Sequence, residues 1–294
     1  MTPAPKQSAT SALYGVTAIG LLTIMDALIK AVSGPFSATQ ILWLRFAITA
    51  VLSAALLMLW RQPWPARKSL PQHLLRAVLM IISNGTFIYA LGTLPFAEVF
   101  ALALTAPLFL AALGAVVLGE RISAMTALGL ALGFAGMLVI VFGNGQFGGQ
   151  AHPPVALIAA LVAPVTYAVG LVLLRQQATG ETPAQVVFAQ ALLVTLMVAP
   201  FMALQAWSGG LPTYAPTLLA IGALSTAGYL ILVKALAGLT AVRYSVIEYT
   251  GLIWAALIGW IWFNERPSMA LWIGAALIVG GACITVMQKE AAKT

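Results

Sequence analysis

The sequence predicts an all-α integral membrane protein whose ten transmembrane helices form two inverted five-helix repeats. Three observations lead to this prediction: an apolar composition, ten apolar stretches of membrane-spanning length, and a charged motif that occurs twice. Of the 294 residues, 62% are hydrophobic and only 7% are charged, and the mean hydropathy is +1.01. Because a soluble domain carries about 25% charged residues, lipid is the solvent expected for most of this chain.

The ten stretches are each long enough to cross the bilayer as a helix, which takes about 20 apolar residues. They are expected at Ala12–Val32, Ala38–Trp60, His73–Thr93, Phe96–Leu118, Ile122–Phe142, Val155–Leu174, Pro183–Ala206, Tyr214–Leu236, Ala241–Phe263 and Met269–Met287. Transmembrane β-strands alternate apolar and polar residues, whereas VLSAALLMLW is almost wholly apolar on both faces. The spans are therefore predicted to be helices.

Basic residues are distributed unevenly between the two ends of these spans. With the N-terminus inside, eleven of the 14 Lys and Arg residues, including Arg76, fall at cytoplasmic ends. Lys30 and Arg266 fall at outer ends, and Arg45 lies within the second span. Cytoplasmic ends of membrane proteins carry such an excess. The net charge of +7 therefore indicates cytoplasmic N- and C-termini and a lipid bilayer partner, and not nucleic-acid binding.

The charged motif reads LGERIS at residues 118–123 and FNERPS at residues 263–268. Glu120 and Glu265 lie 145 residues apart, and the same offset aligns Gln40 with Gln185. The two copies are predicted to be residues 1–150 and 151–294, with each motif capping helix ends at a turn. Because each copy holds an odd number of spans, the second enters the membrane from the opposite side. Secondary transporters built this way hold their substrate near the midplane.

Five plus five helices, with these motifs ending the fourth helix of each half, resemble the drug/metabolite transporter superfamily and specifically its EamA-type exporters. Arg45, which follows Ile-Leu-Trp-Leu in the second helix, also resembles that group, and the chain is similar to YddG-like aromatic amino-acid exporters. The resemblance implies a bacterial inner (plasma) membrane protein with a central cavity lined by helices one to four and six to nine. One departure is Asn264, where the first copy has Gly119.

The resemblance also implies that helices five and ten pack at the side of the cavity. Both carry small residues, which let helices approach closely in lipid. Their glycines are Gly129, Gly133, Gly136, Gly274, Gly280 and Gly281.

Ionisable residues within membrane spans are expensive and are candidates for function. Those predicted here are Asp26, Arg45, Glu98 and Glu248. Asp26 is expected to form a local salt bridge with Lys30, four residues on. Arg45 is expected either to receive a substrate carboxylate or to pair with Asp26 or Glu98.

Glu248 is the strongest candidate for binding a substrate ammonium group. Tyr244 lies one helical turn before it and shares its face, and Tyr249 is adjacent. The repeat aligns Glu248 with Ala103, whose carbonyl Pro107 would free from the helix. The alternative is that Glu248 pairs with Arg243 or a neighbouring helix as a structural contact.

Four aromatic residues and one amide lie deep in the predicted spans and would suit a substrate with an apolar ring. They are Tyr89, Tyr167, Tyr229, Trp254 and Asn84. Each is also compatible with ordinary helix packing. The run Ser83-Asn84-Gly85 suggests a break in the third helix.

We therefore predict a secondary transporter that exports amino acids, including aromatic ones, by alternating access. The alternatives are a multidrug or other small-metabolite exporter of the same superfamily and, more remotely, an intramembrane lipid-modifying enzyme. No H-E-x-x-H or G-x-S-x-G occurs, and those motifs mark metal-dependent and serine hydrolases, so we expect no enzyme, metal or cofactor. The chain is expected to function as a monomer, with proton coupling and facilitated diffusion both open.

Overall fold

The computed structural model describes residues 5–106, 109, 124–146, 152–178, 180–202, 204–205, 207, 211–238, 248 and 250–291. Throughout this part of the chain the secondary structure is helical, with no strand. The α-helices are α1 (Pro5–Val32), α2 (Ala38–Leu59), α3 (Leu70–Leu91), α4 (Phe96–Ala103), α6 (Ala124–Gln146), α7 (Pro154–Ala178), α8 (Pro183–Met202), α9 (Leu211–Gly238), α11 (Thr250–Phe263) and α12 (Met269–Ala291). The predicted ten-helix membrane fold is confirmed.

The helices carry the expected hydropathy. Six of them, α1, α2, α3, α7, α8 and α9, are long and apolar enough to cross a bilayer, and α6, α11 and α12 contain shorter apolar runs. The start of α4 at Phe96 and the end of α11 at Phe263 agree with the predicted fourth and ninth spans, whose remaining parts lie outside the described residues. The Ser83–Gly85 run does not interrupt α3, which is one continuous helix. Those polar side chains are accommodated by hydrogen bonds and not by a break.

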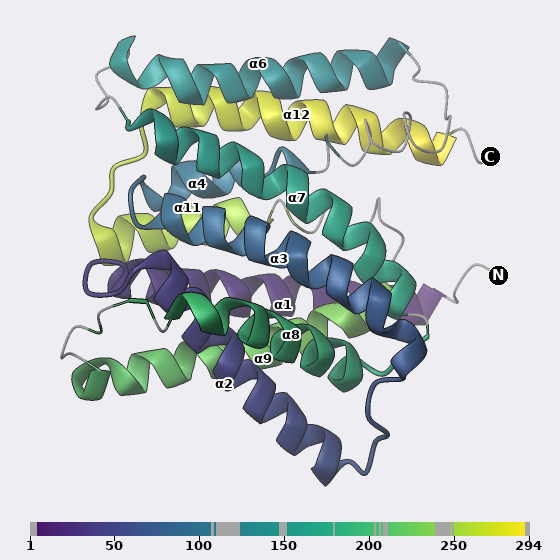
Figure 1. Ribbon diagram of the computed structural model, residues 1–294. Helices are drawn as coiled ribbons and strands as arrows, with labels where there is room; N and C mark the ends of the chain where they lie inside the picture. The colour runs from purple at the N-terminus through teal and green to yellow at the C-terminus, as the bar shows by residue number, and fades with distance from the viewer. Residues whose placement is uncertain are drawn as a thin grey trace.

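Each helix packs mainly against a helix of the other repeat. α1 packs on α9, α3 on α7, α2 on α8, and α6 on α12. The repeat relates α1 to α7, α2 to α8, α3 to α9 and α6 to α12. An inverted two-fold arrangement therefore requires the α1–α9 contact to match the α3–α7 contact. It also relates the α2–α8 contact and the α6–α12 contact each to itself. Figure 1 shows the α6–α12 pair along one edge of the bundle and α2 at the opposite edge.

The second helix of each repeat begins with the same capping arrangement. Ser37 Oγ accepts from the Gln40 N–H at 3.2 Å while Gln40 Oε1 accepts from the Ser37 N–H at 2.9 Å. Thr182 and Gln185 repeat these two bonds at 3.4 and 2.8 Å. Reciprocal bonds of this kind satisfy backbone N–H groups that a helix start leaves unpaired. The Gln40–Gln185 match in the sequence thus reflects a shared helix start.

The second charged motif turns through a left-handed residue. Asn264 follows the last residue of α11 and has φ 51°, a region that Asn and Gly enter more readily than other residues. The first copy has Gly119 at the aligned position. The Asn-for-Gly departure therefore keeps a residue type that tolerates this backbone conformation.

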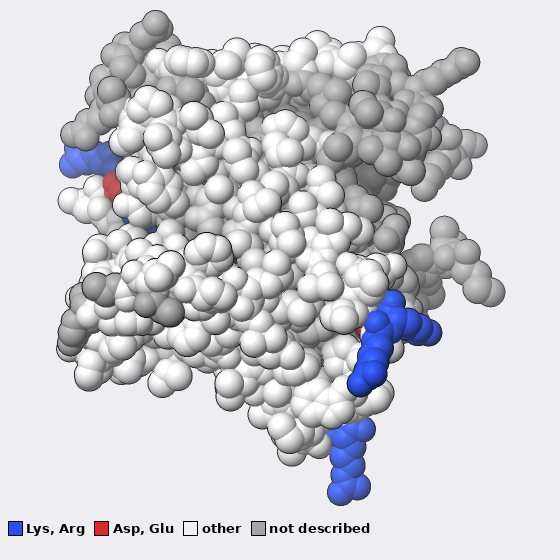
Figure 2. Space-filling view, viewed as in Figure 1, with Lys and Arg blue, Asp and Glu red and all other residues white. Residues whose placement is uncertain are grey.

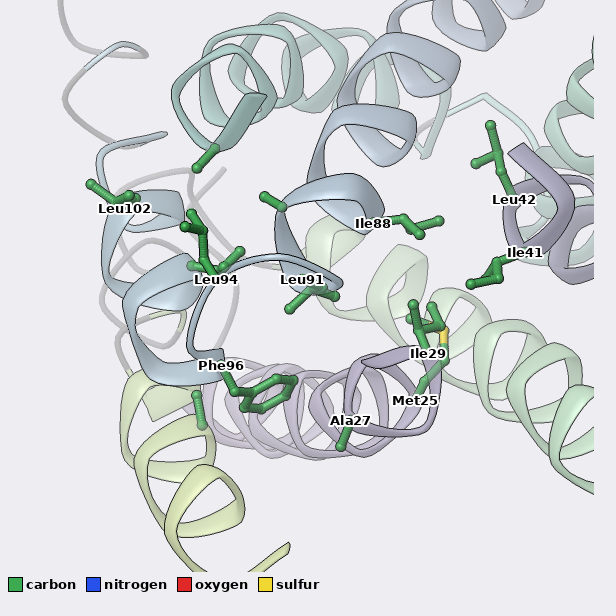
Figure 3. Packing of buried hydrophobic residues seen from close by; sticks show 14 of the residues in the cluster. Met25, Ala27, Ile29, Ile41, Leu42, Ile88, Leu91, Leu94, Phe96 and Leu102 are labelled. Carbon is green, nitrogen blue, oxygen red and sulfur yellow. The ribbon is translucent and has the colours of Figure 1, made fainter. Parts of the chain in front are cut away.

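The surface and core agree with a lipid environment. Figure 2 shows Lys and Arg near opposite ends of the molecule, with an almost uncharged band between them on that face. The largest buried apolar cluster gathers the helix ends predicted to be extracellular. Figure 3 shows part of it, with Met25 and Ile29 of α1 near Ile41 and Leu42 of α2 and Ile88 of α3. The two repeats are closely packed at that end.

Glycines allow α6 and α12 to touch backbone to backbone. A Cβ on Gly136 would lie 2.5 Å from the Gly274 carbonyl oxygen and 2.9 Å from the Leu277 Cβ. A Cβ on Gly281 would clash with the carbonyl oxygen of Gly129. The expected side pair is therefore held at a separation that only glycine permits.

We expect Gly281→Ala to lower the free energy of unfolding by about 1–3 kcal/mol, because overpacking forces the backbones apart. Gly280→Ala is the matched control, since no heavy atom of a described residue lies within 4 Å of its added Cβ. Thermal unfolding of both purified variants in detergent measures the difference. Equal melting temperatures for the two variants would contradict this account of the α6–α12 contact.

Candidate functional site

Arg45 is the centre of a polar cluster between the repeats. Its side chain is 2% exposed. The Nη1 group donates to Asn84 Oδ1 on α3 at 2.9 Å, Nε donates to Ser225 Oγ on α9 at 3.1 Å, and Nη2 donates to Tyr229 Oη at 3.4 Å. Asn84 and Tyr229 are aligned by the 145-residue repeat. The guanidinium therefore bridges equivalent positions of the two halves.

Among the described residues, all three hydrogen-bond partners of Arg45 are neutral. Its guanidinium also lies 5.2 Å from the Phe46 ring centre and 5.6 Å from that of Tyr229, which stabilises a cation without neutralising it. A guanidinium carries five N–H donors, so three hydrogen bonds leave two for another acceptor. A buried charge is costly unless it is paired. The cluster is thus suited to receive an anionic group.

The two carboxylates considered as partners for Arg45 do not form an ion pair with it among the described residues. Glu98 Oε2 lies 2.8 Å from His152 Nε2 instead. Asp26 is 8% exposed on α1 and lies within electrostatic range of Arg45. No Asp26–Arg45 ion pair within 4.0 Å occurs. Neither carboxylate therefore covers the guanidinium of Arg45.

Gln190 is a site residue that sequence reasoning missed. It lies on α8 with 3% exposure, and neither amide atom has a hydrogen-bond partner among the described residues. It lines a cavity of about 10 Å³ together with Thr49, Arg76 and Tyr229. The available signal was the repeat itself, because the 145-residue offset aligns Gln190 with Arg45.

Arg76 is a second buried guanidinium. It lies near the start of α3, at the end predicted to be cytoplasmic, and its side chain is 2% exposed. Charge counting along the sequence does not reveal that this side chain is buried. Two guanidiniums, those of Arg45 and Arg76, are therefore buried between the halves.

The Glu248 region forms a second polar group. Tyr167 Oη on α7 donates to Glu248 Oε1 at 2.7 Å, which brings two predicted site residues together. Tyr244, Tyr249 and Arg243 lie outside the described residues. Ala103 is the last residue of α4, and Pro107 lies outside the described residues.

Two predicted aromatic residues lie apart from these groups. Tyr89 is 42% exposed and lines an apolar cavity of about 770 Å³ between α2, α3 and α8. That cavity reaches Leu42, one turn from Arg45, and Gly85, next to Asn84. Trp254 on α11 is also 42% exposed, whereas Gly251, Ala255 and Gly259 of the same helix are buried.

An ionic junction joins the repeats at the end predicted to be extracellular. Lys30 Nζ lies 3.1 Å from Glu265 Oε1 and donates to the carbonyl oxygens of Leu94 at 2.6 Å and Leu91 at 3.1 Å. Glu265 Oε2 accepts from the N–H of Phe96, the first residue of α4, at 2.6 Å. The second motif therefore caps a helix of the first repeat, and Lys30 pairs with Glu265 rather than with Asp26.

Two histidine–carboxylate contacts also cross between the repeats, at opposite ends of the bundle. His152, just before α7, meets Glu98 in the first turn of α4. His73 Nε2 on α3 lies 2.9 Å from Glu181 Oε2, just before α8. No group of three or more His, Cys, Asp or Glu within the described ranges could hold a metal ion.

The sequence matches the EamA-like transporter family over residues 9–142 and again over residues 154–287. The pseudopaline exporter CntI of Pseudomonas aeruginosa is 29% identical over 95% of this chain and 96% of the relative. The riboflavin transporter of Rhizobium johnstonii is 28% identical over 74% of this chain and 70% of the relative. A crystal structure of another protein aligns with a TM-score of 0.65 at 24% identity, over 97% of this chain and 99% of that one, and so has the same fold.

We expect Lys30→Met and Glu265→Gln each to lower the free energy of unfolding by about 1–3 kcal/mol, because each leaves a partly buried charge without its ion-pair partner. The double variant should cost less than the sum of the two, since no lone charge remains. Thermal unfolding in detergent measures all three. Arg266→Gln, at the adjacent exposed position, is the control and should stay near wild type. Additive single effects would argue against the junction.

Proposed function

The chain belongs to the EamA-like transporter family, and we propose that it exports small zwitterionic metabolites, with amino acids as the first candidates. It is a multi-pass membrane transporter and not an enzyme. The proposal places it in the bacterial inner membrane with both termini in the cytoplasm. The excess of Lys and Arg at the predicted cytoplasmic ends supports this orientation.

The observation that carries the proposal is the state of Arg45. A buried guanidinium with neutral partners and two remaining donors is suited to a carboxylate, which it can bind through two parallel hydrogen bonds. The position between equivalent residues of the two repeats, Asn84 and Tyr229, is where an inverted-repeat transporter holds its substrate. A carboxylate-bearing substrate is therefore favoured over a hydrophobic cation.

Glu248 supplies the complementary charge for an ammonium group. Its carboxylate is partly buried and is oriented by the Tyr167 hydroxyl at 2.7 Å. Tyr167 and Tyr229 both pack against the same apolar cluster, which includes Ala18 and Leu232. A cationic and an anionic group on different helices around one apolar surface suit a zwitterion.

Alternating access follows from the packing of the two repeats. Lys30, Glu265 and Phe96 tie the halves together at one end, and the apolar core is continuous there. Opening that end requires this junction to break. Because the repeats are related by a two-fold axis, the other end can close by the equivalent helix packing. We propose that the chain works as a monomer, with proton coupling to be tested alongside transport.

The relatives favour a second candidate of the same class. Pseudopaline and riboflavin are what the two similar transporters are named for, so a larger metabolite is the alternative to a free amino acid. A preference for aromatic amino acids, as in YddG-like exporters, is one form of the first candidate. The first and second candidates differ in which substrate binds at Arg45.

The function is tested by counterflow in liposomes that contain only this protein. A panel of labelled amino acids should exchange across the membrane, and riboflavin and a hydrophobic cation serve as the competing substrates. Repeating efflux with and without a pH gradient decides between proton coupling and facilitated diffusion. Exchange of the cation but of no carboxylate-bearing solute would overturn the proposal.

We expect Arg45→Gln to weaken substrate binding by roughly ten- to a hundredfold, because a charge-assisted hydrogen bond contributes about 1.5–3 kcal/mol. Arg45→Lys should recover only part of the loss, since an ammonium lacks the planar paired donors. Competition binding to purified, folded variants measures the effect. Wild-type affinity in Arg45→Gln would rule out the carboxylate role.

Glu248→Gln is expected to reduce affinity for zwitterionic substrates while sparing analogues that lack the ammonium group. The amide keeps the shape and can still accept from Tyr167, so only the charge is removed. Comparing an amino acid with its deaminated analogue in the same competition assay separates the two effects. Equal losses for both ligands would indicate a structural role for Glu248.

A further inference from the structure

We propose that Gln190, Tyr229 and Arg76 form a second anion subsite beside Arg45, and that the preferred substrate therefore carries two carboxylates. This inference rests on the proposed function, because it assumes that the first carboxylate binds Arg45. It specifies a substrate class, dicarboxylic amino acids, that the first site alone does not require.

The strongest observation is the unpaired amide of Gln190. The side chain is 3% exposed, and its Nε2 and Oε1 atoms have no hydrogen-bond partner among the described residues. Buried polar groups are nearly always satisfied, and an exception calls for an explanation. Leaving the amide unpaired costs stability, whereas a bound ligand would satisfy it.

The cavity beside Gln190 offers donors to an incoming oxygen. The Tyr229 hydroxyl accepts from Arg45 Nη2 at 3.4 Å, and no hydrogen bond among the described residues uses its own hydrogen. Gln190 Nε2 contributes two more N–H groups. Arg76, which lines the same cavity, adds a positive charge. These groups together favour an anionic oxygen over a neutral or cationic ligand.

The size of the cavity limits what enters it. About 10 Å³ corresponds to roughly one water-sized group, so one carboxylate oxygen fits and a ring does not. The body of the substrate lies outside it, toward Arg45, and enters as the helices part during alternating access.

Tyr229 fixes the relation between the two subsites. Its hydroxyl contacts Arg45 and its side chain lines the Gln190 cavity. Two carboxylates would therefore bind on either side of one hydroxyl, which suits acids separated by a few bonds. The repeat also supports neighbouring subsites. Arg45 and Gln190 are aligned positions on α2 and α8, and these two helices pack on each other.

The test compares Gln190→Leu with wild type in ligand-induced thermal stabilisation and in competition counterflow. The probes are glutamate and aspartate as dicarboxylates, with methionine as the monocarboxylate of a length similar to glutamate. We expect wild type to prefer the dicarboxylates. Gln190→Leu should raise the melting temperature of the ligand-free protein and lower dicarboxylate affinity by about tenfold, with less than about twofold change for methionine.

Thr195→Val is the matched control, because Thr195 is a polar residue on the same helix whose hydroxyl donates to Ala191 O within that helix at 2.7 Å. It should leave the preference unchanged. A more stable Gln190→Leu with unaltered dicarboxylate preference would overturn the subsite, as would a wild type that does not distinguish the two ligand classes. Methionine binding that is lost in Arg45→Gln would then still support the proposed function. If neither ligand class binds wild type, both proposals fail.

Discussion

An odd number of membrane spans in each repeat determines how every helix finds its partner. The second copy must run the opposite way through the bilayer, so α1 can pack on α9 only if α3 packs on α7. In lipid there is no hydrophobic force to gather the helices, and close packing of small residues has to hold them together. The Gly136–Gly274 and Gly129–Gly281 approaches meet that requirement where the two copies meet edge to edge.

The few charges in the chain follow the same constraint. Lys30 with Glu265, His73 with Glu181, and His152 with Glu98 each join one repeat to the other. A charge in hydrocarbon must find a partner, and in these three contacts the partner lies across the interface. Arg45 differs from them, because its three described hydrogen bonds end on neutral groups. That difference makes it a candidate for binding substrate.

Much of the fold could be read from the sequence, because hydropathy and a gapless repeat are one-dimensional signals. The Asn264 position and the Gln40–Gln185 match were visible as aligned residues. Side-chain burial was not, so the exposure of Trp254 and the burial of Arg76 could not be read from the hydropathy pattern. The unpaired amide of Gln190 could not be predicted at all. It depends on whether the neighbouring helices place a donor or an acceptor within hydrogen-bonding distance of that amide.

The symmetry of the backbone and the asymmetry of the side chains have different consequences. Equivalent helices can adopt one arrangement at either face, which alternating access needs. A site that was also symmetric in its side chains would offer the same groups in both directions and could not orient a substrate. At the aligned positions the chain has Arg45 against Gln190 and Asn84 against Tyr229. One half thus presents a cation and the other a neutral donor, and a substrate with unequal ends binds in one orientation while the protein around it reverses.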